Sequence, residues 1–182
     1  MTDIANARIL MIATDGYEDS ELLEPRRILR ERGAEVVLAS LEKGRIEGDD
    51  EASVEVDCTI DEVDEGDFDA LILPGGTKNP DKLRMDRTVV ATVAAFADSG
   101  KPVAAICHGP WLLVEADLVR GRRVTGWPSI RTDLRNAGGE VVDEAAVTDG
   151  NIVTSRNPDD IPAFTEALIA LVEKAGAALE TA

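Results

Sequence analysis

The sequence predicts a three-layer α/β/α sandwich of the flavodoxin-like type, in which helices cover both faces of a mostly parallel sheet. Strand and helix patterns alternate along the chain, which is typical of parallel sheets joined by helices. Most of the strands are short, continuous apolar runs, as expected when both faces of a sheet are buried. With 182 residues and 44% hydrophobic content, we expect one domain over residues 1–182.

The first half of the chain begins with a predicted strand at residues 8–13 and a helix at residues 20–32. That helix ends before Gly33, and glycine commonly follows the last turn of a helix. A second strand is expected at residues 36–39. Residues 53–57 alternate between apolar and polar side chains, which indicates part of an antiparallel excursion with one exposed face.

The second half of the chain contains two buried strands, at residues 70–73 and 103–106, separated by a helix at residues 86–98. We then expect, in order, a helix to about residue 116, a short strand at 124–125, a helix at 129–136, a hairpin at 147–155 and a helix at 158–175. The hairpin is predicted to turn at Asp149-Gly150, a dipeptide that favours tight turns.

Cys107 lies where the buried strand 103–106 ends and an apolar helix begins after Gly109. Pro110 is suited to the first turn of that helix. The unpaired N–H groups at a helix N-terminus favour thiolate over thiol, so we expect a low pKa at Cys107 and a nucleophilic role. The alternative is an inert, buried cysteine at a strand end.

His108 is the only histidine in the chain, so any Cys–His mechanism must use it. Adjacent residues on a regular element point apart. The pair can cooperate only if the turn directs both side chains into one pocket and a third group orients the imidazole. The alternative is a histidine with a purely structural role. Cys58 has no comparable neighbours and is expected to be structural.

Residues 104–110, Ala-Ala-Ile-Cys-His-Gly-Pro, resemble a motif of the PfpI-like family, together with three other segments. These segments are residues 15–22 after the first strand, 73–76 (Leu-Pro-Gly-Gly) and 154–164, the last being similar to the stress-protein branch of bacteria and archaea. The family lies in the class I glutamine-amidotransferase-like superfamily, which also contains the Parkinson-disease-protein deglycases. The amidotransferase branch itself is excluded, because its His-x-Glu motif requires a second histidine.

The resemblance implies several site residues around Cys107. The family residue matching Glu18 hydrogen-bonds the nucleophilic sulfur, although an acid at a helix start commonly only complements the helix dipole. Gly75 and Gly76 are expected at the substrate oxyanion, with the N–H groups of Gly76 and His108 as donors. The alternative for the two glycines is a simple tight turn.

In the family, a glutamate from a neighbouring subunit, located just after the Pro-Gly-Gly turn, orients the histidine. Here the stretch 77–82 is one residue longer and brings Asp81 to that position. Aspartate is one methylene shorter than glutamate, so three alternatives stay open: the triad is kept, re-spaced or absent, which bears on peptidase activity more than on Cys107 chemistry. The resemblance therefore implies a homo-oligomer, either a dimer or a hexamer, with the active site near an interface. We expect Tyr17 and Trp127 to line the mouth of the pocket.

The resemblance implies a cysteine-dependent hydrolase that acts on a carbonyl. We favour a glutathione-independent glyoxalase or protein deglycase acting on methylglyoxal and its early adducts, with a PfpI-type intracellular peptidase as the alternative. A third possibility is a non-enzymatic oxidative-stress sensor, because a reactive thiolate also attacks peroxide. We expect no cofactor and no metal, because the chain lacks nucleotide-binding glycine motifs and Cys-x-x-Cys pairs.

The chain carries 36 acidic and 19 basic residues, a formal net charge of −17. This charge disfavours nucleic acid as a partner. Together with the excess of arginine over lysine, it favours a halophile's protein, whose self-repulsion is screened by concentrated salt. Two cysteines, no membrane-length apolar run and no secretory-signal pattern predict a cytoplasmic location away from membranes.

Overall fold

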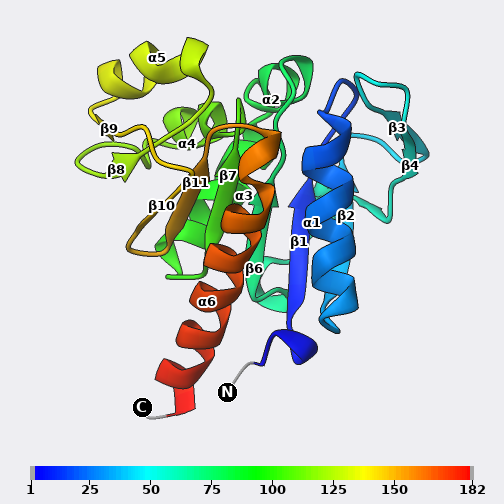
Figure 1. The fold of residues 1–182 in the computed structure, drawn as a ribbon. Helices are drawn as coiled ribbons and strands as arrows, with labels where there is room; N and C mark the ends of the chain where they lie inside the picture. Colours follow the sequence, from blue (N-terminus) through cyan, green and yellow to red (C-terminus); the bar gives the residue numbers. More distant parts are fainter. Residues whose placement is uncertain (1–2, 181–182) are drawn as a thin grey trace.

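The computed structural model describes residues 3–180, which form a seven-stranded sheet with helices on both faces (Figure 1). Neighbouring strands are parallel except at one edge, where β10 and β11 are antiparallel. This arrangement confirms the predicted α/β sandwich. Across the sheet the strands are β10 (Ala146–Asp149), β11 (Ile152–Ser155), β7 (Val103–Ile106), β6 (Ala70–Leu73), β1 (Arg8–Ile12), β2 (Glu35–Ser40) and β5 (Cys58–Thr59).

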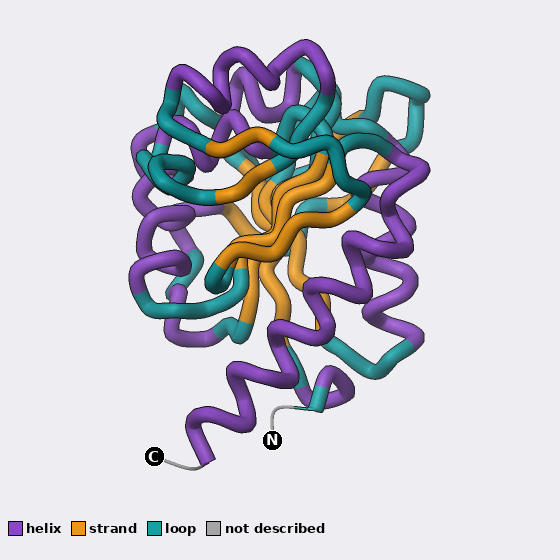
Figure 2. The backbone as a smooth tube through the Cα atoms, turned by 60° about the vertical axis from the view of Figure 1, so that its left-hand side comes forward, coloured by secondary structure: helices purple, strands orange, loops and turns teal. Residues whose placement is uncertain are grey.

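Two helical layers enclose the sheet (Figure 2). One contains α1 (Asp19–Glu31) and α6 (Ile161–Glu180), and the other contains α3 (Arg87–Asp98) and α4 (Pro110–Glu115). None of the helices within residues 3–180 is both long and apolar enough to cross a membrane. The short elements outside these layers are α2 (Lys78–Leu83), α5 (Arg131–Asn136), the pair β3 (Arg45–Glu47) and β4 (Ser53–Glu55), and the pair β8 (Arg123–Val124) and β9 (Glu140–Val141).

Strand β1 shows why the strands are apolar on both faces. Ile9 and Met11 pack into the core beneath α1 and α6, whereas Leu10 and Ile12 pack into the core beneath α3. Successive side chains of a strand point to opposite faces, so a strand between two helical layers requires apolar residues at every position. The continuous apolar runs in the sequence follow from this geometry.

The predicted elements agree with the structure at most positions. Strands β6 and β7 begin and end at the predicted residues, and the excursion predicted around residues 53–57 is the antiparallel β3–β4 pair. Helix α2 was not predicted, because it has six residues and Pro80 lies inside it. The predicted helix at 129–136 is a 3-10 turn, Pro128–Ile130, followed by α5.

Three neighbouring parallel strands bring their following loops to one edge of the sheet. The loops after β1, β6 and β7 begin at Ala13, Pro74 and Cys107. In open α/β sheets, ligands bind outside the carboxyl ends of the strands, near the point where the strand order reverses. Here the chain moves outward from β1 to β2 and returns to β6 on the other side of β1, which places that point at β1 and β6.

Candidate active site

Cys107 follows β7 and adopts a left-handed backbone conformation with φ of 62°. This turn is held from both sides: the Cys107 N–H donates to the Ser155 carbonyl at 3.0 Å, and the Cys107 carbonyl accepts from the Trp127 N–H at 2.9 Å. A residue with a β-carbon is destabilised in this conformation by roughly 1–2 kcal/mol. Such strain is common at functional sites, where a sharp turn presents a side chain to the substrate.

Glu21 is the acid that lies beside the sulfur. It is fully buried, and its Oε2 accepts a hydrogen bond from the Gly75 N–H at 2.9 Å. Its Oε1 has no hydrogen-bond partner among the described residues, and the Cys107 thiol is a close neighbour of the carboxyl group that favours its charged form. Burial, with a smaller contribution from the charge of Glu18, raises the pKa of Glu21 to about 8. The carboxyl is therefore mostly protonated at neutral pH and can donate a proton to the sulfur.

Glu18 does not contact the sulfur, so the position expected for it was wrong. It is the N-cap of α1, and its carboxylate accepts hydrogen bonds from the Ser20 hydroxyl and the Glu21 N–H. This is the alternative role that the sequence left open. A cap residue uses its side chain on the exposed N–H groups of the first turn, whereas the residue three positions later points inward toward the sheet.

The expectation of a low thiol pKa is also wrong. Burial raises the pKa of Cys107, and the charge of Glu21 raises it further. The N–H groups of His108 and Gly76 act in the opposite direction. Helix α4 has only six residues, and the N–H groups near the sulfur do not offset the desolvation of the thiolate. A thiolate at Cys107 thus depends on Glu21 holding its proton, since two adjacent negative charges repel each other.

The two glycines have different tasks. The Gly76 N–H and the His108 N–H both face the Cys107 sulfur, where they are placed as the predicted oxyanion donors would be. The Gly75 N–H is instead bonded to Glu21. Neither position accepts a side chain: a β-carbon on Gly75 would lie 2.7 Å from the Cys107 β-carbon, and one on Gly76 would lie 2.4 Å from the Gly16 carbonyl oxygen.

The His108 imidazole lies between the sulfur and a serine. Its Nδ1 is 3.3 Å from the Cys107 sulfur, and its Nε2 is 3.4 Å from the Ser129 hydroxyl. Burial lowers the pKa of His108, so the neutral ring is the form present at neutral pH. A proton on Nε2, directed at Ser129, leaves Nδ1 free to accept the thiol proton. Ser129 was not predicted, because nothing around it in the sequence marks it as a partner of His108.

Trp127 and Tyr17, both expected at the pocket mouth, lie in different surroundings. The Trp127 side chain is partly exposed and stacks on the His108 ring with 5.9 Å between ring centroids, which fits that expectation. Trp111 also contacts the His108 ring, in an edge-to-face arrangement. Tyr17 is fully buried and donates to the Ala52 carbonyl, so it lies in the core and the expectation for Tyr17 is wrong.

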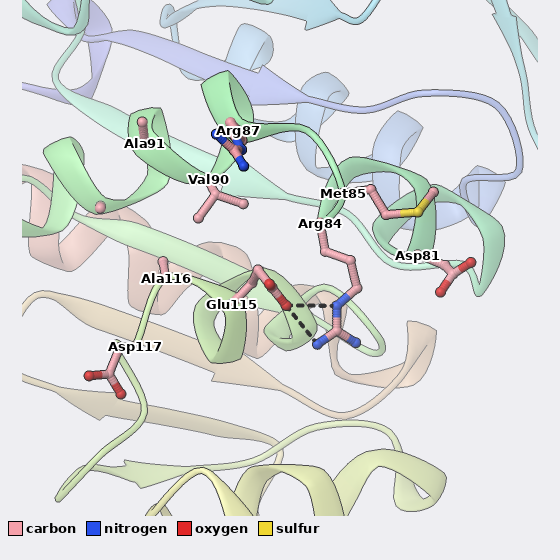
Figure 3. A pocket seen from close by; sticks show the side chains of 10 residues that line it. Asp81, Arg84, Met85, Arg87, Val90, Ala91, Glu115, Ala116 and Asp117 are labelled. Carbon is pink, nitrogen blue, oxygen red and sulfur yellow. Dashed lines mark hydrogen bonds and ion pairs between the residues drawn. The ribbon is translucent and has the colours of Figure 1, made fainter.

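Asp81 lies in α2 at the rim of a separate cavity of about 750 Å³, shown in Figure 3. The cavity lies between α2, α3 and α4, where Arg84 is paired with Glu115 at 3.0 Å and Met85 is largely exposed. No hydrogen bond or ion pair in the described chain joins Asp81 to His108 of the same subunit. A role for Asp81 across a subunit interface remains a prediction.

Comparison with known proteins supplies a family for this arrangement. A model of the DJ-1/PfpI family matches residues 7–171. General stress protein 18 of Bacillus subtilis is 48% identical over 170 residues, covering 92% of this chain and 98% of that protein. Protein/nucleic acid deglycase 2 of Escherichia coli is 46% identical over 91% of this chain and 97% of its own. Deglycase PfpI of Pyrococcus furiosus is 43% identical over 91% of this chain and 99% of its own.

Solved structures agree with the sequence relatives. Drosophila melanogaster DJ-1beta superposes with a TM-score of 0.84 and 26% identity, covering 95% of this chain and 97% of that chain. A two-domain protein of Anabaena variabilis, containing DJ-1/ThiJ/PfpI-like and ferritin-like domains, superposes with a TM-score of 0.88 and 38% identity. It covers 90% of this chain and 47% of that longer chain.

Proposed function

Since this chain belongs to the DJ-1/PfpI family, we propose that it is a cysteine-dependent hydrolase of carbonyl compounds, acting as a deglycase and glyoxalase on methylglyoxal and its early adducts. The observation that carries this proposal is the surroundings of the Cys107 sulfur. A protonated acid, a neutral imidazole and two backbone N–H groups converge on one thiol. Addition of a thiol to an aldehyde uses this set of groups.

The reaction with methylglyoxal follows from these groups. The sulfur adds to the aldehyde carbon, the thiol proton is transferred to the developing oxyanion, and the N–H groups of Gly76 and His108 stabilise that oxyanion. A base then removes the proton from the former aldehyde carbon, and a proton is returned to the neighbouring carbon. Glu21 and His108 Nδ1 are the groups placed for these transfers. Water cleaves the resulting thioester, so methylglyoxal and water give lactate with no net oxidation.

A peptidase is the second candidate. The 3.3 Å contact between His108 Nδ1 and the Cys107 sulfur favours it, and a relative of 43% identity in Bacillus subtilis is named putative cysteine protease YraA. Peptide cleavage also requires protonation of a leaving amine by an oriented imidazolium. The Nε2 partner of His108 is a neutral hydroxyl, Ser129, and within residues 3–180 no carboxylate hydrogen-bonds the ring. We therefore place aldehyde chemistry first.

The test measures conversion of methylglyoxal to lactate by the purified protein without added glutathione. We expect turnover in the unmodified protein and in Cys58→Ala, and no turnover in Cys107→Ala. Brisk cleavage of peptide substrates with no action on methylglyoxal would replace this proposal with the peptidase. Inactivity toward both, with Cys107 oxidised by low concentrations of peroxide, would favour the oxidative-stress sensor.

We further propose that the protein is a homo-oligomer in the cytoplasm of a halophile, with Asp81 of one subunit near His108 of another. The exposed Trp127 side chain, which stacks on the buried His108 ring, and the placement of Asp81 on a separate cavity that His108 does not line support this arrangement. The relative in Escherichia coli is named for nucleic acid as well as protein. The net charge of −17 in this chain favours small molecules and protein adducts over nucleic acid.

A further inference from the structure

Asn79 joins the loops that follow β1 and β6. Its side chain is fully buried, and its Oδ1 accepts from the Thr14 N–H at 2.8 Å. Its Nδ2 donates to two carbonyls, those of Pro74 and Gly75, at 3.0 Å each. Its own N–H donates to the Gly16 carbonyl at 3.2 Å. One amide thus makes three side-chain hydrogen bonds without access to water, and these bonds are directional and costly to lose.

The loop that Asn79 holds carries two N–H groups of the candidate active site. Gly75 N–H donates to Glu21, and Gly76 N–H faces the Cys107 sulfur. The Gly75 N–H is in the same peptide unit as the Pro74 carbonyl, and the Gly76 N–H is in the same peptide unit as the Gly75 carbonyl. Asn79 binds both of these carbonyls. Rotation of these units would turn both donors away from their targets. No other side chain hydrogen-bonds the Pro74 or Gly75 carbonyl within residues 3–180.

We infer that Asn79 is a positioning residue, which fixes the Pro74–Gly76 turn so that one N–H holds the Glu21 carboxyl and the next faces the Cys107 sulfur. Asn79 touches neither the sulfur nor a substrate; it acts through the backbone of this turn. A role of Asn79 in catalysis rests on the proposed function, but the effect of Asn79 on the reactivity of the Cys107 thiol can be measured without any substrate.

Asn151 provides a matched control. Its Nδ2 also donates to two carbonyls, those of Ala97 and Lys101, at 3.0 and 2.9 Å. Asn151 precedes β11 at the amino edge of the sheet, opposite to the edge that carries Cys107. Substitution at either asparagine removes a pair of Nδ2 hydrogen bonds to carbonyls, and Asn79 additionally accepts from Thr14; only substitutions at Asn79 disturb the Pro74–Gly76 turn.

The experiment uses the Cys58→Ala protein, in which Cys107 is the sole thiol, with Asn79→Asp, Asn79→Ser, Asn151→Asp and Asn151→Ser added singly. The second-order rate constant for alkylation by iodoacetamide is measured from about pH 6 to about pH 10, next to thermal unfolding. Serine is included because aspartate adds a charge near the thiol. Glu21 and His108 are the titratable groups that face the sulfur, and they are unchanged in every variant.

We expect both Asn79 variants to alkylate about tenfold more slowly at neutral pH, with the profile moved to higher pH, as a one-unit rise in the thiol pKa would produce. Loss of the Gly76 N–H raises the pKa of Cys107, and loss of the Gly75 N–H raises that of Glu21. Both Asn151 variants should match the parent within about twofold. In methylglyoxal turnover, Asn79→Ser should lower kcat by roughly 10²-fold, the scale of a small misplacement of reacting groups.

Three results would overturn the inference. Asn79→Ser could alkylate like the parent, Asn151→Ser could slow alkylation equally, or both Asn79 variants could fail to fold, which would assign the side chain to stability alone. Absence of methylglyoxal turnover in the parent protein, with the Asn79 effect on alkylation intact, would refute the proposed function and leave the positioning role standing.

Discussion

Replacement of Glu21 by glutamine separates proton transfer from the other tasks of this side chain. Glutamine has the same shape, and its oxygen can still accept the Gly75 N–H bond that Glu21 accepts at 2.9 Å. It cannot take up or release a proton. We therefore expect Glu21→Gln to fold and to lose methylglyoxal turnover by roughly 10²-fold or more, the usual scale for losing an acid–base group.

The same substitution has a calculable effect on stability. The pKa of Glu21 rises from 4.5 to about 8 in the folded protein, mainly because the group is buried. The stability associated with this raised pKa is fully present below about pH 4.5 and is lost as pH rises through about 8, because the unfolded chain releases the proton first. At about 1.36 kcal/mol per unit, the loss is on the order of 5 kcal/mol. Glutamine does not titrate, so Glu21→Gln should gain stability relative to the unmodified protein across this window.

Urea denaturation at about pH 5 and about pH 8 measures the difference in unfolding free energy between the two proteins. Glu18→Gln is the control, since it makes the same chemical change one helical turn away. That variant should keep turnover within a few-fold and lose at most about 1 kcal/mol from the N-cap. A stability difference that does not change with pH would refute the buried, protonated Glu21. Loss of turnover in Glu18→Gln with activity retained in Glu21→Gln would refute the assignment of the acid.

The site and the charge lead to four further predictions. Alkylation of Cys107 should accelerate toward alkaline pH less steeply in the unmodified protein than in Glu21→Gln, because only the former gains a second negative charge beside the sulfur, which opposes the thiolate; identical profiles would contradict the shared site. Ser129→Ala should lower kcat by about tenfold, the value of one hydrogen bond. Asp81→Asn should lower turnover only if the active protein is an oligomer, and an active monomer in sedimentation would remove Asp81 from the mechanism. The melting temperature should rise between about 0.1 and about 2 M KCl, and a flat or falling value would refute the halophile assignment.

The sequence predicted the layers of the fold well because continuous apolar runs and helical patterns are local signals. Strands β6 and β7 were placed at their observed ends for this reason. Cys107 and His108 could be identified because a thiol and the sole histidine follow a buried strand. Glu21 could not be separated from Glu18, since the choice depends on where α1 begins and which way its first turn faces. The pKa of Cys107 was predicted in the wrong direction, because desolvation is a property of the packed site and is not visible in a motif.

The left-handed backbone at Cys107 means that the residue required by the proposed chemistry is not the one that would be most stable at this position. Among the described residues with a side chain, only Glu51, Cys107 and Asp117 have a positive φ, and the other two are charged residues outside the site. Glycine would adopt the conformation without the strain of roughly 1–2 kcal/mol that a β-carbon brings. Under the proposed function, only a cysteine at this position supplies the sulfur, so the fold carries the strain in order to present a thiol. Cys107→Gly should therefore be more stable than the unmodified protein while losing the thiol.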